Sequence, residues 1–234
     1  MKYGDAKLRY GVHPSEELGR LFREKPYQGN NPFDARVLVI GNDANYSPEI
    51  SDHKFFERIL DYHADGVAFW RRTSRHHPFL LDDYPFDRRK GGVRYHQNFG
   101  KMKFGPDDAG QFSFVELLNV PTIGNTGSDK ELFYRLLDKD HLAWLERLVF
   151  GGEKKFVLVN QTLARSIGTI SKRFGVLGDL ASALKDKPAP GIGLETNNVV
   201  LYNGYSFSHS IENEYLLELA NKIRQFIEDG GKTC

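Results

Sequence analysis

Two spacings of apolar residues alternate along the chain. Four short runs are largely apolar, and the one at residues 37–40 is continuously so, which is typical of parallel strands buried on both faces. These predicted strands lie at residues 37–40, 112–118, 155–159 and 199–202. Between them, apolar residues recur three and four positions apart and predict amphipathic helices. These lie at residues 14–24, 51–62, 128–137, 141–150, 161–174 and 211–228. The alternation predicts a three-layer αβα fold whose central, mainly parallel sheet has about four strands.

Polar residues at the helix starts support this pattern. Ser15 opens the first helix, Ser51 can cap the second, and Ser128 with Glu131 forms a capping box. Prolines and glycines between residues 185 and 193 predict a connection before the last strand. We find no internal repeat, and we expect residues 1–234 to form a single α/β domain.

One stretch, from about residue 64 to 106, lacks a clear period. Arginine, histidine, aromatic residues, proline and glycine crowd together there. We expect a loop-rich insertion around one short helix near residues 95–102. Long irregular stretches in compact domains are usually functional or mobile.

Composition narrows the class of protein. The 234 residues carry a formal net charge of +1, so charge alone neither demands nor forbids a polyanionic partner. The only cysteine is Cys234, which excludes an intramolecular disulfide and a thiolate metal cluster. No secretory signal or membrane-length apolar stretch is present in the sequence. We therefore expect a cytoplasmic monomer that does not associate with membranes.

Three polar residues stand just after predicted strands. Asp43 follows the first strand, Asn119 ends the Leu117-Leu118-Asn119 run, and His209 follows the last strand. In an open α/β sheet the carboxyl ends of parallel strands meet at one edge, where ligands bind. We expect these three side chains to share one cleft. Asp43 could alternatively be a turn residue or helix cap, and His209 could cap the last helix. Asn119 could instead hydrogen-bond the loop through Pro121.

Together these segments resemble the uracil-DNA glycosylase superfamily. The resemblance rests on Gly41-Asn42-Asp43, on Leu117-Leu118-Asn119 and on His209-Ser210, in the same order and over most of the chain. The stretch from Gly66 to Phe69 also looks like the one that supplies that family's base-stacking ring. The chain departs from the family at Ala44 and Ser210, where the family has prolines.

The resemblance implies cleavage of a base–sugar bond in DNA. Breaking this bond creates positive charge on the sugar and negative charge on the base, which Asp43 and His209 could stabilise. Asn119 could read uracil through its amide donor and acceptor, because uracil presents a matching N–H and C=O pair. Phe69 could stack on a flipped base. We add Asn42 and Tyr46, which lie beside Asp43, to the predicted base-binding residues. A core role for Phe69 is the alternative.

The insertion supplies candidate nucleic-acid contacts. Basic residues there are interleaved with aromatic ones, a pattern that suits phosphates and splayed bases. The residues predicted to contact nucleic acid are Arg71, Arg72, Arg88, Arg89, Ser208 and Ser210. Neighbouring aspartates leave a self-neutralising surface loop as the alternative. His76 and His77 are adjacent and point in different directions on most backbones, so we expect no metal, and we expect no cofactor.

The sequence thus predicts a glycosylase-like hydrolase that removes uracil or another deaminated base from single- or double-stranded DNA. Two alternatives remain open. One is a protein of the same fold that binds a base, nucleotide or nucleic acid without cleaving it. The other is a hydrolase of small nucleosides or esters, which would have a compact pocket closed by the insertion.

Overall fold

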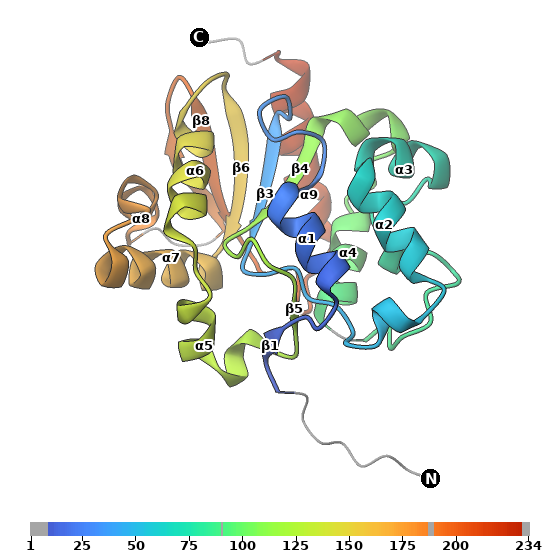
Figure 1. Ribbon diagram of the computed structural model, residues 1–234. Helices are drawn as coiled ribbons and strands as arrows, with labels where there is room; N and C mark the ends of the chain where they lie inside the picture. The colour runs from blue at the N-terminus through green and yellow to red at the C-terminus, as the bar shows by residue number, and fades with distance from the viewer. Residues whose placement is uncertain (1–8, 90, 187–189, 231–234) are drawn as a thin grey trace.

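The computed structural model describes residues 9–89, 91–186 and 190–230. Its centre is a six-stranded sheet in the order β2-β4-β3-β6-β8-β7 (Figure 1). The four inner strands are parallel, whereas β2 and β7 run antiparallel to their neighbours at the two edges. The strands are β2 (Tyr27–Gly29), β3 (Val37–Gly41), β4 (Phe112–Glu116), β6 (Lys155–Asn160), β7 (Gly191–Glu195) and β8 (Val199–Gly204).

The four predicted strands are therefore confirmed as the parallel core, but the sheet is wider than predicted by its two edge strands. Strand β2 has only three residues, and β7 falls in a glycine-containing stretch that the sequence assigned to a connection. Edge strands pair on one side only and need no continuous apolar run, so their pattern is weak.

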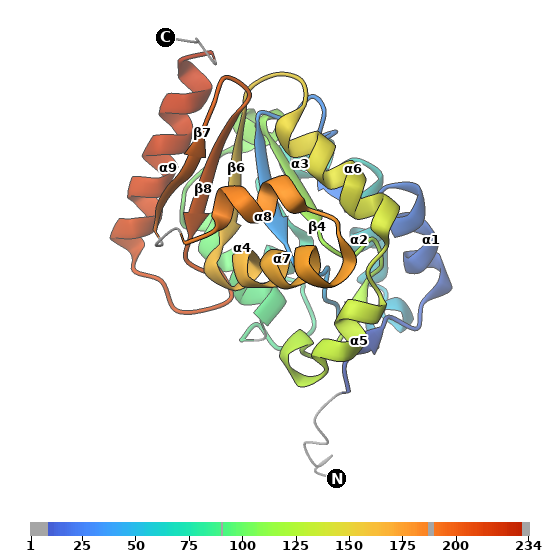
Figure 2. The ribbon, with the colours of Figure 1, turned by 90° about the vertical axis from the view of Figure 1, so that its left-hand side faces the viewer.

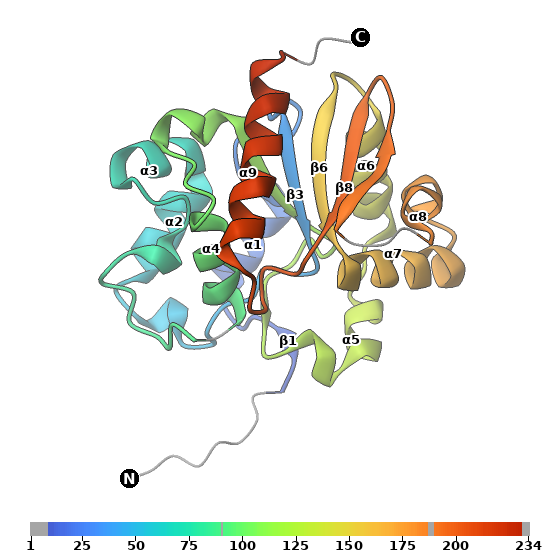
Figure 3. The same cartoon turned by 180° about the vertical axis from the view of Figure 1, so that it is seen from behind.

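Helices cover both faces of the sheet, which makes the three layers visible in Figures 2 and 3. On one face, a core cluster joins Leu38 and Ile40 to helices α6 (Lys139–Phe150), α7 (Gln161–Phe174) and α8 (Gly178–Leu184). On the other, Val37 and Val39 pack with α3 (Gly66–Thr73), α4 (Gly91–Gly100) and α9 (Asn213–Glu228). Successive residues of β3 thus alternate between the two cores, as strand geometry requires.

A third apolar cluster lies beside the second core. It joins α1 (Glu16–Glu24) and α2 (Phe56–Ala64) to the segment after β3 and to part of the insertion. Ser15 caps α1 as predicted, because its hydroxyl accepts a hydrogen bond from the Leu18 amide at 3.2 Å.

Two other predicted caps are wrong. Ser51 lies in a short 3-10 turn, Ile50–Asp52, and α2 begins later, at Phe56. Asp129, rather than Ser128, caps the short helix α5 (Lys130–Arg135) and accepts from the Leu132 amide at 2.9 Å. An aspartate and a serine both suit the position, so the sequence left the register of this helix undecided.

The insertion is more helical than predicted. Besides α4, which begins earlier than expected, it contains α3, whose N-cap Asp65 accepts from the Ala68 amide at 2.9 Å. The sequence pattern did not predict α3, because the arginines in its last turn follow directly after Phe69 and Trp70 and hide the apolar periodicity. Among the described residues, no helix is long and apolar enough to span a membrane.

Candidate functional site

The three predicted site residues all follow carboxyl ends of parallel strands, at the lower side of the sheet in Figure 1. Asp43 follows β3, Asn119 follows β4 and His209 follows β8. The segments after β3 and β4 stay paired, because the Leu118 amide donates to the Asn42 carbonyl at 3.1 Å. The side chains themselves enter three different surroundings. Within the described ranges, no hydrogen bond or ion pair joins any two of them.

Asp43 is held by three hydroxyl groups. Its Oδ2 accepts from Thr122 at 2.5 Å and from Tyr10 at 3.2 Å, and its Oδ1 accepts from Thr126 at 3.0 Å. The small antiparallel pair β1 (Gly11–Val12) and β5 (Thr122–Ile123) brings Tyr10 and the threonines to this place. Burial raises the pKa of Asp43, and the three hydroxyl donors partly oppose that shift.

Asn119 turns toward helix α6. Its amide donates to Oδ2 of Asp138 at 3.1 Å, while Oδ1 of Asp138 caps the helix by accepting from the amides of Asp140 and His141. This contact lies on the face of the sheet that α6 covers.

His209 has an exposed side chain, as do Ser208 and Ser210. Its loop is tied to α4 through Asn98, whose amide donates to the carbonyls of Phe207 and His209 at 2.7 and 2.8 Å. Asn98 thus fixes the backbone after β8 and leaves the imidazole free to meet a ligand from solvent.

The other predicted base-binding residues differ in accessibility. Phe69 is fully buried and packs edge-on against Tyr62, with ring centroids 5.4 Å apart. Tyr46 is also buried, and its hydroxyl accepts from Gln28 at 2.7 Å. Asn42 differs, because its Oδ1 is buried and lacks a hydrogen-bond partner in the described structure. Such an atom is costly unless a ligand or water donates to it.

Most of the predicted phosphate-binding arginines already have partners. Arg72 pairs with Asp61, Arg89 pairs with Asp87 at 3.0 Å, and Arg88 donates to the carbonyls of Leu81 and Asp82. Arg71, by contrast, is exposed, and within the described part of the chain it has no recorded ion pair.

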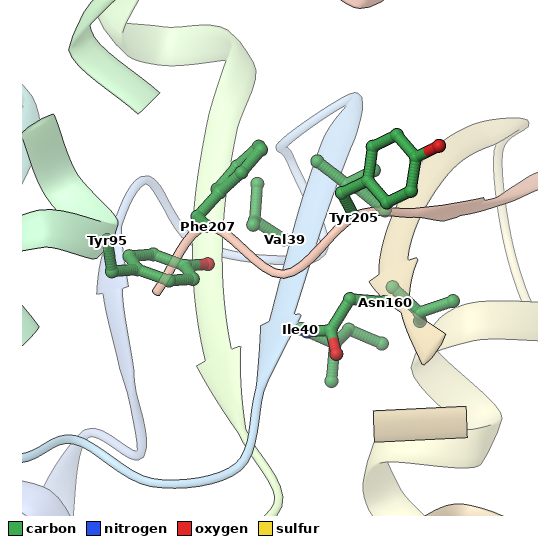
Figure 4. A pocket seen from close by; sticks show the side chains of 8 residues that line it. Val39, Ile40, Tyr95, Asn160, Tyr205 and Phe207 are labelled. Atoms are coloured by element: carbon green, nitrogen blue, oxygen red, sulfur yellow. The ribbon is translucent and has the colours of Figure 1, made fainter. Parts of the chain in front are cut away.

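A narrow crevice opens between β3 and β6, where the chain changes direction across the sheet. From β3 the chain goes to β4 on one side and later enters β6 on the other, and ligands of open α/β sheets bind at such switch points. Figure 4 shows Tyr95 and Phe207 on one side of the crevice and Tyr205 and Asn160 on the other. Its enclosed volume of about 10 Å³ holds about one water molecule.

Glu116, which the sequence pattern did not single out, lies outside the crevice lining but interacts electrostatically with Asp43 and with a crevice residue. It is the last residue of β4, and burial together with the charge of Asp43 raises its pKa to about 8. Burial and the charge of Glu116 in turn raise the pKa of Tyr95, which lines the crevice. A signal was present in the sequence, since Glu116 is the one carboxylate in the predicted buried run 112–118.

The insertion buries three histidines. The rings of His77 and His96 stack with centroids 3.6 Å apart, and Nε2 of His76 lies 3.2 Å from Nδ1 of His96. In the ranges that the structure describes, no group of three or more histidine, cysteine or acidic side chains is arranged to hold a metal ion.

Comparisons with known proteins identify no family. No family model matches the chain, and no solved structure matches it. A segment of 126 residues, 53% of the chain, is 29% identical to part of human dynein axonemal heavy chain 1. The match spans about 3% of the length of that protein, so it carries no functional argument.

Proposed function

We propose that the chain hydrolyses the base–sugar bond of uracil or another deaminated base in DNA, in the manner of the uracil-DNA glycosylases that its motifs resemble. One observation carries the proposal: the charge of Asp43 acts on the buried carboxyl group of Glu116, and the charge of Glu116 acts on Tyr95, which lines an aromatic crevice at the switch point of the sheet. Switch-point crevices are where open α/β sheets bind ligands, and interacting buried carboxyl groups with perturbed pKa values suit acid–base chemistry.

The two carboxyl groups would have different roles. With a pKa of about 8, Glu116 is mainly protonated at pH 7 and can give its proton to the departing base nitrogen. As the bond between the anomeric carbon and the base nitrogen breaks, a charged Asp43 would stabilise the cationic sugar. The anomeric carbon then bonds to the oxygen of water, and the carboxylate of Asp43 takes up the proton that this water loses. The exposed imidazole of His209 is a second donor to the base, and Asn119 remains the proposed reader of its edge.

A second candidate function is supported by the surroundings of Asp43. Three hydroxyls already occupy its oxygens, and the crevice holds about one water, so activating another water requires rearrangement. These features favour a protein that binds a nucleobase or nucleotide without cleaving it. The unpartnered Oδ1 of Asn42 could then accept from the bound ligand.

Labelled oligonucleotides carrying uracil, hypoxanthine or xanthine separate the two candidates. Wild-type protein should create alkali-labile sites at one of these bases, and Glu116→Gln and Asp43→Asn should each slow cleavage about a hundredfold or more. Glu131→Gln is the matched control, because it makes the same change at an exposed carboxylate that pairs with Arg173. Its rate should equal that of wild type.

Absence of cleavage also separates the candidates, depending on whether the protein still binds the oligonucleotide. If no deaminated base is released but an oligonucleotide binds saturably, and if Asn42→Ala weakens that binding, the hydrolase proposal fails and the binding function stands. If neither cleavage nor saturable binding occurs, both candidate functions fail.

A further inference from the structure

A second cavity lies away from the crevice, where the residues before β3 meet the start of α6. It is an open groove of about 440 Å³, a size typical of small-ligand sites. The groove is lined by aromatic rings and carboxylates, and Asn119 reaches it through its hydrogen bond to Asp138.

Aromatic rings form one part of the groove. Phe33 is 62% exposed, unusual for a phenylalanine, and its ring lies edge-on to Trp144 with centroids 6.4 Å apart. His141 stacks on Trp144 at 5.3 Å and so fixes the indole plane. The third ring is that of Tyr27, which already holds the Lys25 ammonium 5.1 Å from its centroid. The contact between Lys25 and Tyr27 is an example of the attraction between an ammonium group and an aromatic face.

Carboxylate groups form the other part of the groove. Asp138 and Asp140 line the groove, and neither lysine nor arginine is among its lining residues. The His141 amide is the main cause of a lowered pKa at Asp138, and the amides of Asn119 and Asp140 add to it. Asp138 therefore stays ionised at neutral pH, and the wall of the groove is anionic.

We propose that this groove binds a small ligand ending in a quaternary ammonium group. Aromatic faces attract such a cation through their quadrupole, and nearby carboxylates supply the opposite charge. Methylated nitrogen is favoured over a primary ammonium because it is weakly hydrated and fills an apolar volume between rings. The groove shares no lining residue with the crevice, and of the residues proposed for base hydrolysis Asn119 lines it.

Calorimetric titration with choline tests the proposal directly. The comparison ligand is 3,3-dimethylbutan-1-ol, which has the same shape but carries no charge. Choline should bind saturably and at least about fivefold more tightly than the neutral alcohol, and Trp144→Ala should weaken choline binding by about tenfold. Equal affinities for the two ligands, or no saturable binding of choline, would overturn the proposal.

Asp138→Asn tests the charge while keeping the helix cap, because asparagine caps helices as well as aspartate does. It should weaken choline binding several-fold and leave the affinity for the neutral alcohol unchanged. Asp129→Asn is the matched control: it makes the same change at the cap of α5, outside the groove. If both variants bind choline like wild type, the groove does not use its charge and the proposal fails. Circular dichroism should show the same helix content in both.

Discussion

At the scale of single residues, the space above Gly41 is filled by the carboxyl group of Glu116. A Cβ at Gly41 would lie 2.0 Å from Oε2 of Glu116. The two residues are register partners in the parallel strands β3 and β4, so the glycine creates the room in which the carboxyl group lies. This contact fixes the Glu116 carboxyl group against the end of β3, two residues before Asp43.

The raised pKa of Glu116 predicts a pH dependence of stability. The folded protein keeps this group protonated up to about pH 8, whereas the unfolded chain loses the proton near its ordinary pKa of 4.5. The unfolded state therefore binds fewer protons between these values, and the free energy of unfolding falls as pH rises through this window. Glu116→Gln should remove this contribution, a few kcal/mol at pH 8.

Denaturant unfolding at pH 5, 6.5 and 8 measures the effect. Glu116→Gln should gain stability over wild type progressively toward pH 8, while Glu131→Gln should follow the wild-type curve. A constant offset between Glu116→Gln and wild type at all three pH values would mean that Glu116 is ionised in the folded protein at neutral pH.

Gly41→Ala should disturb this arrangement. The added methyl group forces the Glu116 carboxyl group away and should cost about 1–3 kcal/mol of stability. Adding Glu116→Ala to it should restore part of that loss, because the clash disappears, and the coupling between the two changes is read from a double-mutant cycle.

Gly168→Ala, inside α7, is the control for the glycine change itself. An added Cβ there meets no atom within 4 Å, and alanine favours helix, so this variant should be about 0.5–1 kcal/mol more stable than wild type.

Fully additive effects of Gly41→Ala and Glu116→Ala would show that the two side chains do not compete for space.

At the scale of elements, sequence patterns located the inner strands because these are largely apolar, as is typical of a strand buried on both faces. They also placed α7 at its observed bounds, Gln161–Phe174, where Asn160 caps the helix and Gly175 ends it in a left-handed conformation. The periodicity of the sequence could not predict the direction in which the side chains of Asp43 and Asn119 point. The partners of Asp43 and Asn119 come from β1, β5 and α6, whose approach depends on tertiary packing.

The three buried histidines of the insertion make its stability sensitive to acid. Burial lowers the pKa of His76 to about 3 and holds those of His77 and His96 well below 6.5. These groups stay neutral in the fold but take up protons in the unfolded chain below pH 6.5. The stability they contribute is therefore present above pH 6.5 and is lost as pH falls.

His96→Phe removes one of these groups. The loss of unfolding free energy between pH 7.5 and pH 5 should become about 2 kcal/mol smaller than in wild type. The comparison is made within each protein, so an offset from the lost contact with His76 cancels. His209→Gln, at an exposed histidine, is the control. An unchanged pH dependence in His96→Phe would mean that His96 is protonated in the folded state.

At the scale of the whole molecule, the net charge of +1 is small, and some arginines are paired with acids. Both features limit the electrostatic attraction between the protein and a nucleic acid. The sequence showed the basic residues of the insertion and aspartates near them, but it could not show which arginines pair with an acid. Arg72 pairs with Asp61 of α2, and Arg89 with Asp87 in its own loop. The structure thus favours the self-neutralising alternative for these two residues. Of the four arginines predicted to contact phosphate, Arg71 is exposed and has no ion pair among the described residues.

This distribution predicts a shallow salt dependence of binding to DNA. A protein that neutralises one or two phosphates loses affinity with a log–log slope of about −1 to −2, because each phosphate contact releases about one counterion. Arg71→Ala should reduce the slope by about one unit, whereas Arg89→Ala should leave it nearly unchanged, since Asp87 already neutralises that guanidinium. Fluorescence anisotropy of a labelled single strand between about 50 and 200 mM salt measures both slopes. Equal reductions in the two variants would mean that Arg89 leaves Asp87 to bind phosphate. A steep slope that neither variant changes would move the DNA-binding surface away from the insertion altogether.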